Sequence, residues 1–132
     1  MTTRAPGRIL PTAAAVAVLF GLLTIASGGN ALFGGAAARE AAGAYVPFVL
    51  WFNFLAGFAY VAAGAGLWLG RRWATILALA IAGATLLVFA AFGIHVLNGG
   101  PYEIRTVGAM TLRTVVWMAI GWLAWRRIPR HA

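Results

Sequence analysis

Four long apolar segments, separated by short breaks, constrain the fold of this chain more than any other feature. Each segment is close to the roughly 20 residues that an α-helix needs to cross a bilayer. Hydrophobic residues make up 63% of the 132 residues and charged residues only 9%, whereas about a quarter of the residues in a soluble domain are charged. The sequence therefore predicts an all-α protein, an antiparallel four-helix transmembrane bundle, and excludes a water-soluble surface.

Glycine, asparagine and arginine mark the ends of these segments. The predicted helices cover about 10–27, 45–69, 73–97 and 101–125, and together they form a single transmembrane domain over residues 1–132. Before the last helix, Gly100 is predicted as the N-cap, Pro101 as the first helical residue and Glu103 as an acid in the first turn. The longer connection, residues 28–44, is predicted to be partly helical, lying at the membrane interface or folded back over the mouth of the bundle.

The arginines predict the orientation. All ten basic residues are arginine, and the formal net charge is +8. Most of them lie on one predicted side of the membrane, beside the termini and the turn after the second helix: Arg4, Arg8, Arg71, Arg72, Arg126, Arg127 and Arg130. Clusters of this kind face the cytoplasm. Arginine without lysine, with abundant alanine and glycine, is also typical of a GC-rich bacterial genome. We therefore predict a multi-pass protein of the bacterial inner membrane with both termini cytoplasmic, in contact with the lipid bilayer and with no nucleic-acid partner.

A second interpretation of the first segment stays open. Residues 1–27 combine a basic start with an apolar stretch and small residues, as a secretory signal peptide does. Cleavage would leave three helices and move the new N-terminus to the outer side.

Arg113 stands in the middle of the last apolar segment. A charge at that depth costs about 3 kcal/mol on insertion scales and usually faces a protein interior, a water pocket or a ligand. At the rise of an α-helix, Arg113 lies roughly 18 Å below the outer boundary, between Asn53 at roughly 12 Å and Tyr60 at roughly 22 Å. Asn53 and Tyr60 share a helix face. We therefore predict that these three side chains form the deep part of a ligand site.

Three residues near the outer boundary complete the predicted ligand site. His95 lies near the outer end of the third helix, and Tyr102 and Glu103 lie at the start of the fourth. A histidine there could control protonation, because its charge changes near neutral pH.

Each candidate also has a structural explanation, which the sequence leaves open. Arg113 could bind backbone carbonyls or reach toward water, or could contact another protein. His95 could bond to a nearby carbonyl, and Asn53 and Tyr60 could serve helix packing. Glu103 could be a helix-start charge paired with Arg39.

Several kinds of chemistry are excluded by what the sequence lacks. The chain has no cysteine, which excludes disulfides, thiolate metal sites and a cysteine nucleophile. It contains no aspartate and no metalloprotease, phosphate-loop or serine-hydrolase motif. His95 and His131 alone cannot hold a metal. No catalytic residue, metal or cofactor is predicted, and an enzyme is the less favoured class.

Two segments carry a resemblance to a known family. Tyr45–Trp73 (YVPFVLWFNFLAGFAYVAAGAGLWLGRRW) and His95–Arg113 (HVLNGGPYEIRTVGAMTLR) resemble an uncharacterised family of small bacterial four-span integral membrane proteins. The resemblance implies a single motif made of Asn53, His95, Tyr102, Glu103 and Arg113, and it implies no activity. A looser similarity to DoxX-type proteins rests on size and topology alone.

Three function hypotheses follow. The first is a membrane protein with an outward-facing polar pocket that binds or passes a small or lipid-soluble molecule, with Arg113 holding an anionic or carbonyl group. The second is an accessory or assembly subunit of a larger membrane complex. The third is a membrane enzyme acting on a quinone or lipid. A homodimer would supply space that four helices alone do not enclose.

Overall fold

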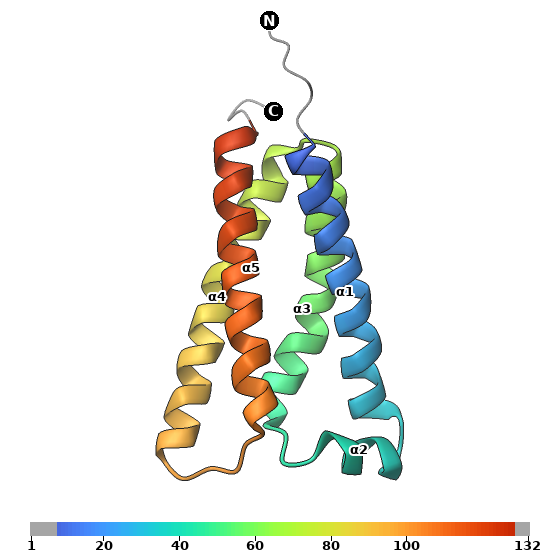
Figure 1. The fold of residues 1–132 in the computed structure, drawn as a ribbon, viewed down its shortest axis with the longest axis vertical. Helices are drawn as coiled ribbons and strands as arrows, with labels where there is room; N and C mark the ends of the chain where they lie inside the picture. The colour runs from blue at the N-terminus through green and yellow to red at the C-terminus, as the bar shows by residue number, and fades with distance from the viewer. Residues whose placement is uncertain (1–7, 129–132) are drawn as a thin grey trace, which may run out of the picture.

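A computed structural model describes residues 8–128, and this part of the chain is an antiparallel helical bundle (Figure 1). The long helices are α1 (Ile9–Phe33), α3 (Pro47–Trp68), α4 (Arg72–Leu97) and α5 (Ile104–Arg127). The short helix α2 (Ala36–Ala42) joins α1 to α3 across one end of the bundle. Within residues 8–128, four helices are long and apolar enough to cross a membrane. The predicted all-α fold class is confirmed, and the chain is a multi-pass membrane protein.

The first long helix continues past its predicted end. It was expected to stop at Ser27, before Gly28-Gly29-Asn30, but α1 runs on to Phe33. Gly28 is buried because it faces α3: a Cβ atom there would lie 3.1 Å from the Cβ of Phe54. This close packing holds the glycines in helical conformation. The helix ends instead at Gly34 and Gly35, where Gly35 has a φ of 95° that other residues rarely adopt.

The last helix begins later than predicted. Pro101 lies in the connection rather than at the first helical position, and α5 begins at Ile104 with Glu103 as its N-cap residue. Glu103 is extended there and makes no side-chain capping bond to its own helix. Its carboxylate accepts a hydrogen bond from the backbone N–H of Ala44 instead. A contact between distant segments therefore decides where this helix starts. The connection 28–44 is partly helical, as predicted, through α2.

Helices α1 and α3 form the closest helix pair of the bundle. Gly21 and Gly57 face each other: a Cβ on Gly21 would lie 2.7 Å from the carbonyl oxygen of Gly57, and a Cβ on Gly57 would lie 3.1 Å from that of Gly21. Small residues let backbones approach in lipid, where packing rather than the hydrophobic effect joins helices. In contrast, α1 and α5 contact each other at few positions. The bundle is therefore tight on one side and loosely closed on the other.

Large apolar side chains cover the outside of the bundle. The exposed ones come from every long helix and include Leu19, Leu55, Leu87, Val115 and Trp122. The buried core instead combines small residues with a few large side chains, Tyr60 and Trp117 among them. This distribution suits a surface in contact with lipid tails.

We expect Gly21→Ala to destabilise the bundle by roughly 1–3 kcal/mol, because the added methyl group would press against backbone that cannot move aside. Gly83→Ala is the matched control, since a Cβ at Gly83 in α4 would meet nothing within 4 Å. Unfolding in detergent, followed by tryptophan fluorescence, measures both variants. Equal stability of the two would show that α1 and α3 do not approach as closely as described.

Candidate functional site

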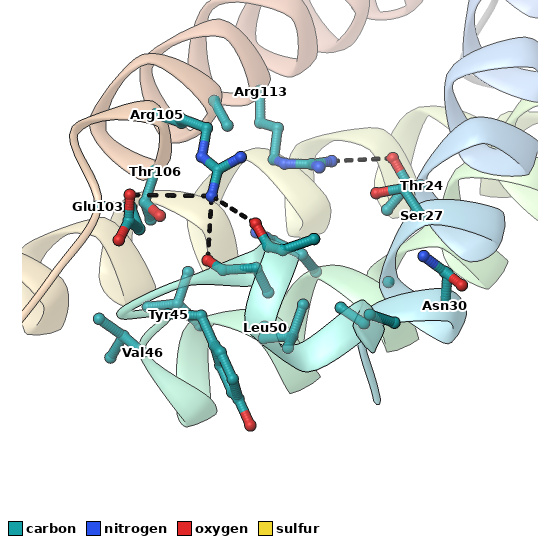
Figure 2. A pocket seen from close by; sticks show the side chains of 18 residues that line it. Thr24, Ser27, Asn30, Tyr45, Val46, Leu50, Glu103, Arg105, Thr106 and Arg113 are labelled. Carbon is teal, nitrogen blue, oxygen red and sulfur yellow. Dashed lines mark hydrogen bonds and ion pairs between the residues drawn. The ribbon is translucent and has the colours of Figure 1, made fainter. Parts of the chain in front are cut away.

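A cavity of about 370 Å³ lies between α1, α3 and α5 at the end of the bundle that α2 crosses (Figure 2). Its walls come from the last turns of α1, the first turns of α3 and α5, and one side of α2. Ligand sites in proteins usually enclose about 300–1,000 Å³. The cavity exists because α1 and α5 contact each other at few positions, and α2 lies over it.

Arg113 reaches from α5 toward α1, where the cavity is deepest in the bundle (Figure 2). Its Nη1 donates to the Thr24 hydroxyl oxygen at 3.0 Å and, more weakly, to the Tyr60 hydroxyl oxygen at 3.4 Å. Its guanidinium carbon lies 5.1 Å from the ring centroid of Phe20, within reach of a cation–π interaction. The guanidinium therefore connects three helices.

No carboxylate among the described residues neutralises Arg113. The two acids of the chain are Glu40 and Glu103, and the ion pair found in residues 8–128 joins Glu103 to Arg105. The Arg113 Nε is buried without a hydrogen-bond partner. Its Nη2 hydrogen-bonds to none of the described residues either. Arg113 thus has no acidic partner among the described residues, and its Nη2 donors are unused in the cavity wall.

Asn53 and Tyr60, which the sequence groups with Arg113, take different positions. Tyr60 touches the guanidinium, but it is fully buried in the core, with its ring centroid 4.8 Å from that of Trp117. Asn53 lines the cavity without a hydrogen bond to Arg113, and its Oδ1 is buried with no partner in residues 8–128. Asn53 therefore belongs to the cavity, whereas Tyr60 supports Arg113 from behind.

Thr24 and Ser27 of α1 were missed by the sequence reasoning. Both line the cavity, and Thr24 is the nearest hydrogen-bond partner of Arg113. Expecting the first helix to end at Ser27 placed these residues at a helix terminus, where hydroxyls are unremarkable. Their position in the sequence could have indicated this role, because Thr24 and Ser27 are polar side chains in the second half of an apolar segment.

Glu103 and Arg105 hold the connection between α2 and α3 at the cavity mouth (Figure 2). Glu103 Oε2 accepts from the Ala44 N–H at 2.7 Å, and its Oε1 lies 3.8 Å from Arg105 Nη2. Arg105 Nη2 donates to the carbonyl oxygens of Ala41 and Ala42, both at 3.1 Å. These carbonyls end α2, where a positive charge is favourable. Glu103 is therefore paired with Arg105, and its suggested pairing with Arg39 is wrong.

His95 and Tyr102 lie outside the cavity lining. His95 Nε2 is 2.9 Å from the carbonyl oxygen of Pro101, which corresponds to the structural alternative considered for this residue. The Tyr102 ring packs edge-on against Phe92, with 5.9 Å between centroids. Of the predicted site residues, the structure therefore brings Arg113, Asn53 and Glu103 to one cavity and places Tyr60 behind it.

Metal ligands do not gather at this site. Across residues 8–128, no three histidine, cysteine, aspartate or glutamate side chains are placed to hold a metal ion. His131 lies outside the described residues.

Comparisons with known proteins add no family assignment. No family model matches the chain, and no match is found to a curated protein or to a solved structure. The class is therefore defined by the fold and the cavity: a multi-pass membrane protein with an arginine in the wall of a cavity at one end of its bundle.

We expect Thr24→Val to cost roughly 0.5–1.5 kcal/mol of stability, since it removes a hydrogen bond to the guanidinium while keeping the side-chain shape. In an Arg113→Leu background the same substitution should cost nothing, because its partner is gone. Thermal or denaturant unfolding of the two single variants and the double variant measures this coupling. An equal cost in both backgrounds would mean that Thr24 does not bind Arg113.

Proposed function

We propose that this chain is a protein of the bacterial inner membrane whose cavity opens to the outer side and binds or passes a small or lipid-soluble molecule. The molecule carries an anionic or carbonyl group that Arg113 holds. One observation carries the proposal: Arg113 lines a cavity and has no carboxylate partner among the described residues.

The unused donors of Arg113 support a ligand-binding role over a purely structural one. An arginine side chain has five N–H donors, and those of Nη1 are directed to Thr24 and Tyr60. A structural arginine in a membrane bundle would satisfy its remaining donors on carbonyls or acids. Here Nε is buried and unpaired, and Nη2 has no protein partner within residues 8–128. A ligand oxygen in the cavity would pair with the Nη2 donors, whereas the buried Nε is closed off from the cavity.

The distribution of charge supports an outward-facing cavity. Figure 1 shows α2 at the end of the bundle opposite to the start of α1 and the end of α5, and residues of α2 line the cavity. That opposite end carries Arg8, Arg71, Arg72, Arg126 and Arg127. At the cavity end, the mouth arginine Arg105 is paired with Glu103. By the positive-inside rule the arginine-rich end, with both termini, faces the cytoplasm.

We expect molecules retained through purification to depend on Arg113. The protein is purified in mild detergent as wild type, Arg113→Leu and Arg71→Leu, and retained small molecules are identified by mass spectrometry. Wild type and Arg71→Leu should retain a compound with an anionic or carbonyl group that Arg113→Leu loses. Arg71 is the matched control because it is exposed at the other end of the bundle. The unfolding midpoints of all three proteins are measured alongside, so that retained compounds are compared between folded proteins.

Two other outcomes contradict this function. If Arg113→Leu loses a co-purifying protein instead of a small molecule, the chain is a subunit of a larger complex and Arg113 is a contact residue. If Arg113→Leu is more stable than wild type and retains the same compounds, both the ligand-site and the partner-contact hypotheses fail.

A further inference from the structure

Hydrogen-bond donors from three helices line the cavity without partners among the described residues. Ser27 comes from α1, Asn53 from α3 and Arg113 from α5, and all three line the same space. The Ser27 hydroxyl, the Asn53 amide nitrogen and the Arg113 Nη2 hydrogen-bond to no residue in the described part of the chain. Donors that line one cavity together with a positive charge are suited to the oxygens of an anion.

The charge of the cavity lining favours a single negative charge. Its charged side chains are Arg113, Arg105 and Glu103. Arg105 and Glu103 lie 3.8 Å apart at the mouth and offset each other, which leaves Arg113 uncompensated. One negative charge on the ligand balances Arg113, whereas a second would be desolvated without a partner.

The rest of the lining favours an apolar chain of limited length. Beside polar side chains, the remaining walls include the apolar Val46, Val49, Leu50 and Ala109. A cavity of about 370 Å³ has room for about a dozen non-hydrogen atoms at the ~30 Å³ that a water molecule occupies. That is the size of a medium-chain carboxylate.

Taking the proposed function as its basis, we propose that the cavity binds an amphipathic monoanion: a carboxylate or similar oxyanion held by Arg113, Asn53 and Ser27, with one medium-length alkyl chain along the apolar wall. A dianionic headgroup carries more negative charge than Arg113 alone can balance. A small hydrophilic anion makes no contact with the apolar wall.

The test uses the full chain in phosphatidylcholine nanodiscs, with unfolding followed by tryptophan fluorescence. The probes are decanoate, methyl decanoate, decylamine, decyl phosphate and acetate. Decanoate should raise the Tm, and the other four should raise it less or not at all. The decanoate affinity should fall roughly 10–100-fold in Arg113→Leu, as expected for losing a charge-assisted hydrogen bond. It should fall roughly 2–10-fold in Ser27→Ala and in Asn53→Ala.

A pair of leucine variants tests where the alkyl chain of the ligand lies. Ala109→Leu narrows the cavity and should weaken decanoate binding, whereas Ala90→Leu on the exposed face of α4 should not. If Ala109→Leu fails to fold, the Arg113, Ser27 and Asn53 variants still test which residues bind the headgroup. Equal decanoate affinity in the Ala109→Leu and Ala90→Leu variants would show that the alkyl chain does not lie along the wall that contains Ala109.

The failure of this inference can be told apart from failure of the proposed function. If methyl decanoate or decyl phosphate binds in an Arg113-dependent way and decanoate does not, the monoanion class is wrong and the binding function stands. If decanoate binds wild type and Arg113→Leu equally, the headgroup assignment is overturned. The proposed function itself fails only if the compounds retained by wild type do not depend on Arg113.

Discussion

A guanidinium inside a lipid-embedded bundle is the constraint on which this structure depends. Arg113 has no carboxylate to pair with in residues 8–128, so its charge must be stabilised by neutral groups, by a ring face and by whatever enters the cavity. Those neutral groups come from two other helices, Thr24 of α1 and Tyr60 of α3. Arg113 is also the polar link between α1 and α5, which otherwise touch little. The same side chain therefore links α1 to α5 and lines the cavity between them.

The cavity follows from unequal packing around this arginine. Facing glycines draw α1 and α3 together, whereas α5 carries large side chains, such as Trp117, into the core. A bundle that is tight on the α1–α3 side has space left where α5 approaches α1. The short helix α2 lies over that space, and Glu103 and Arg105 hold its C-terminal end to α5. The cavity therefore has polar groups inside the bundle and a short helix over its outer end.

The sequence predicts the fold well because hydrophobicity and length alone decide whether a segment crosses a bilayer. It predicts helix ends poorly, since these depend on contacts between distant segments. Gly28 stays helical because it packs on Phe54, and α5 begins at Ile104 because the Glu103 carboxylate binds the backbone of Ala44. Counting residues from the membrane boundary places Arg113 and Tyr60 at similar depths. It does not show how each helix is rotated about its own axis. For that reason it did not separate Asn53, on the cavity wall, from Tyr60, in the core.

Thr24 shows why the partners of Arg113 are harder to predict than Arg113 itself. A helical threonine can satisfy its hydroxyl on the carbonyl one turn earlier, as Thr85 and Thr114 do here. A threonine in an apolar segment is therefore uninformative until its neighbour is known. His95 is the converse case: its chemistry suggests function, but it is engaged by the Pro101 carbonyl.

Thiol accessibility tests the central claim, an Arg113 side chain that faces a water-accessible cavity and not lipid. The chain contains no cysteine, so Arg113→Cys and its neighbour Leu112→Cys each introduce a single thiol. Leu112 is exposed on the outside of α5 and faces lipid in this account. A charged, membrane-impermeant thiol reagent added from the side of the membrane on which α2 lies should modify Arg113→Cys and leave Leu112→Cys unmodified. An unreactive Arg113→Cys, with or without a reactive Leu112→Cys, would contradict the account.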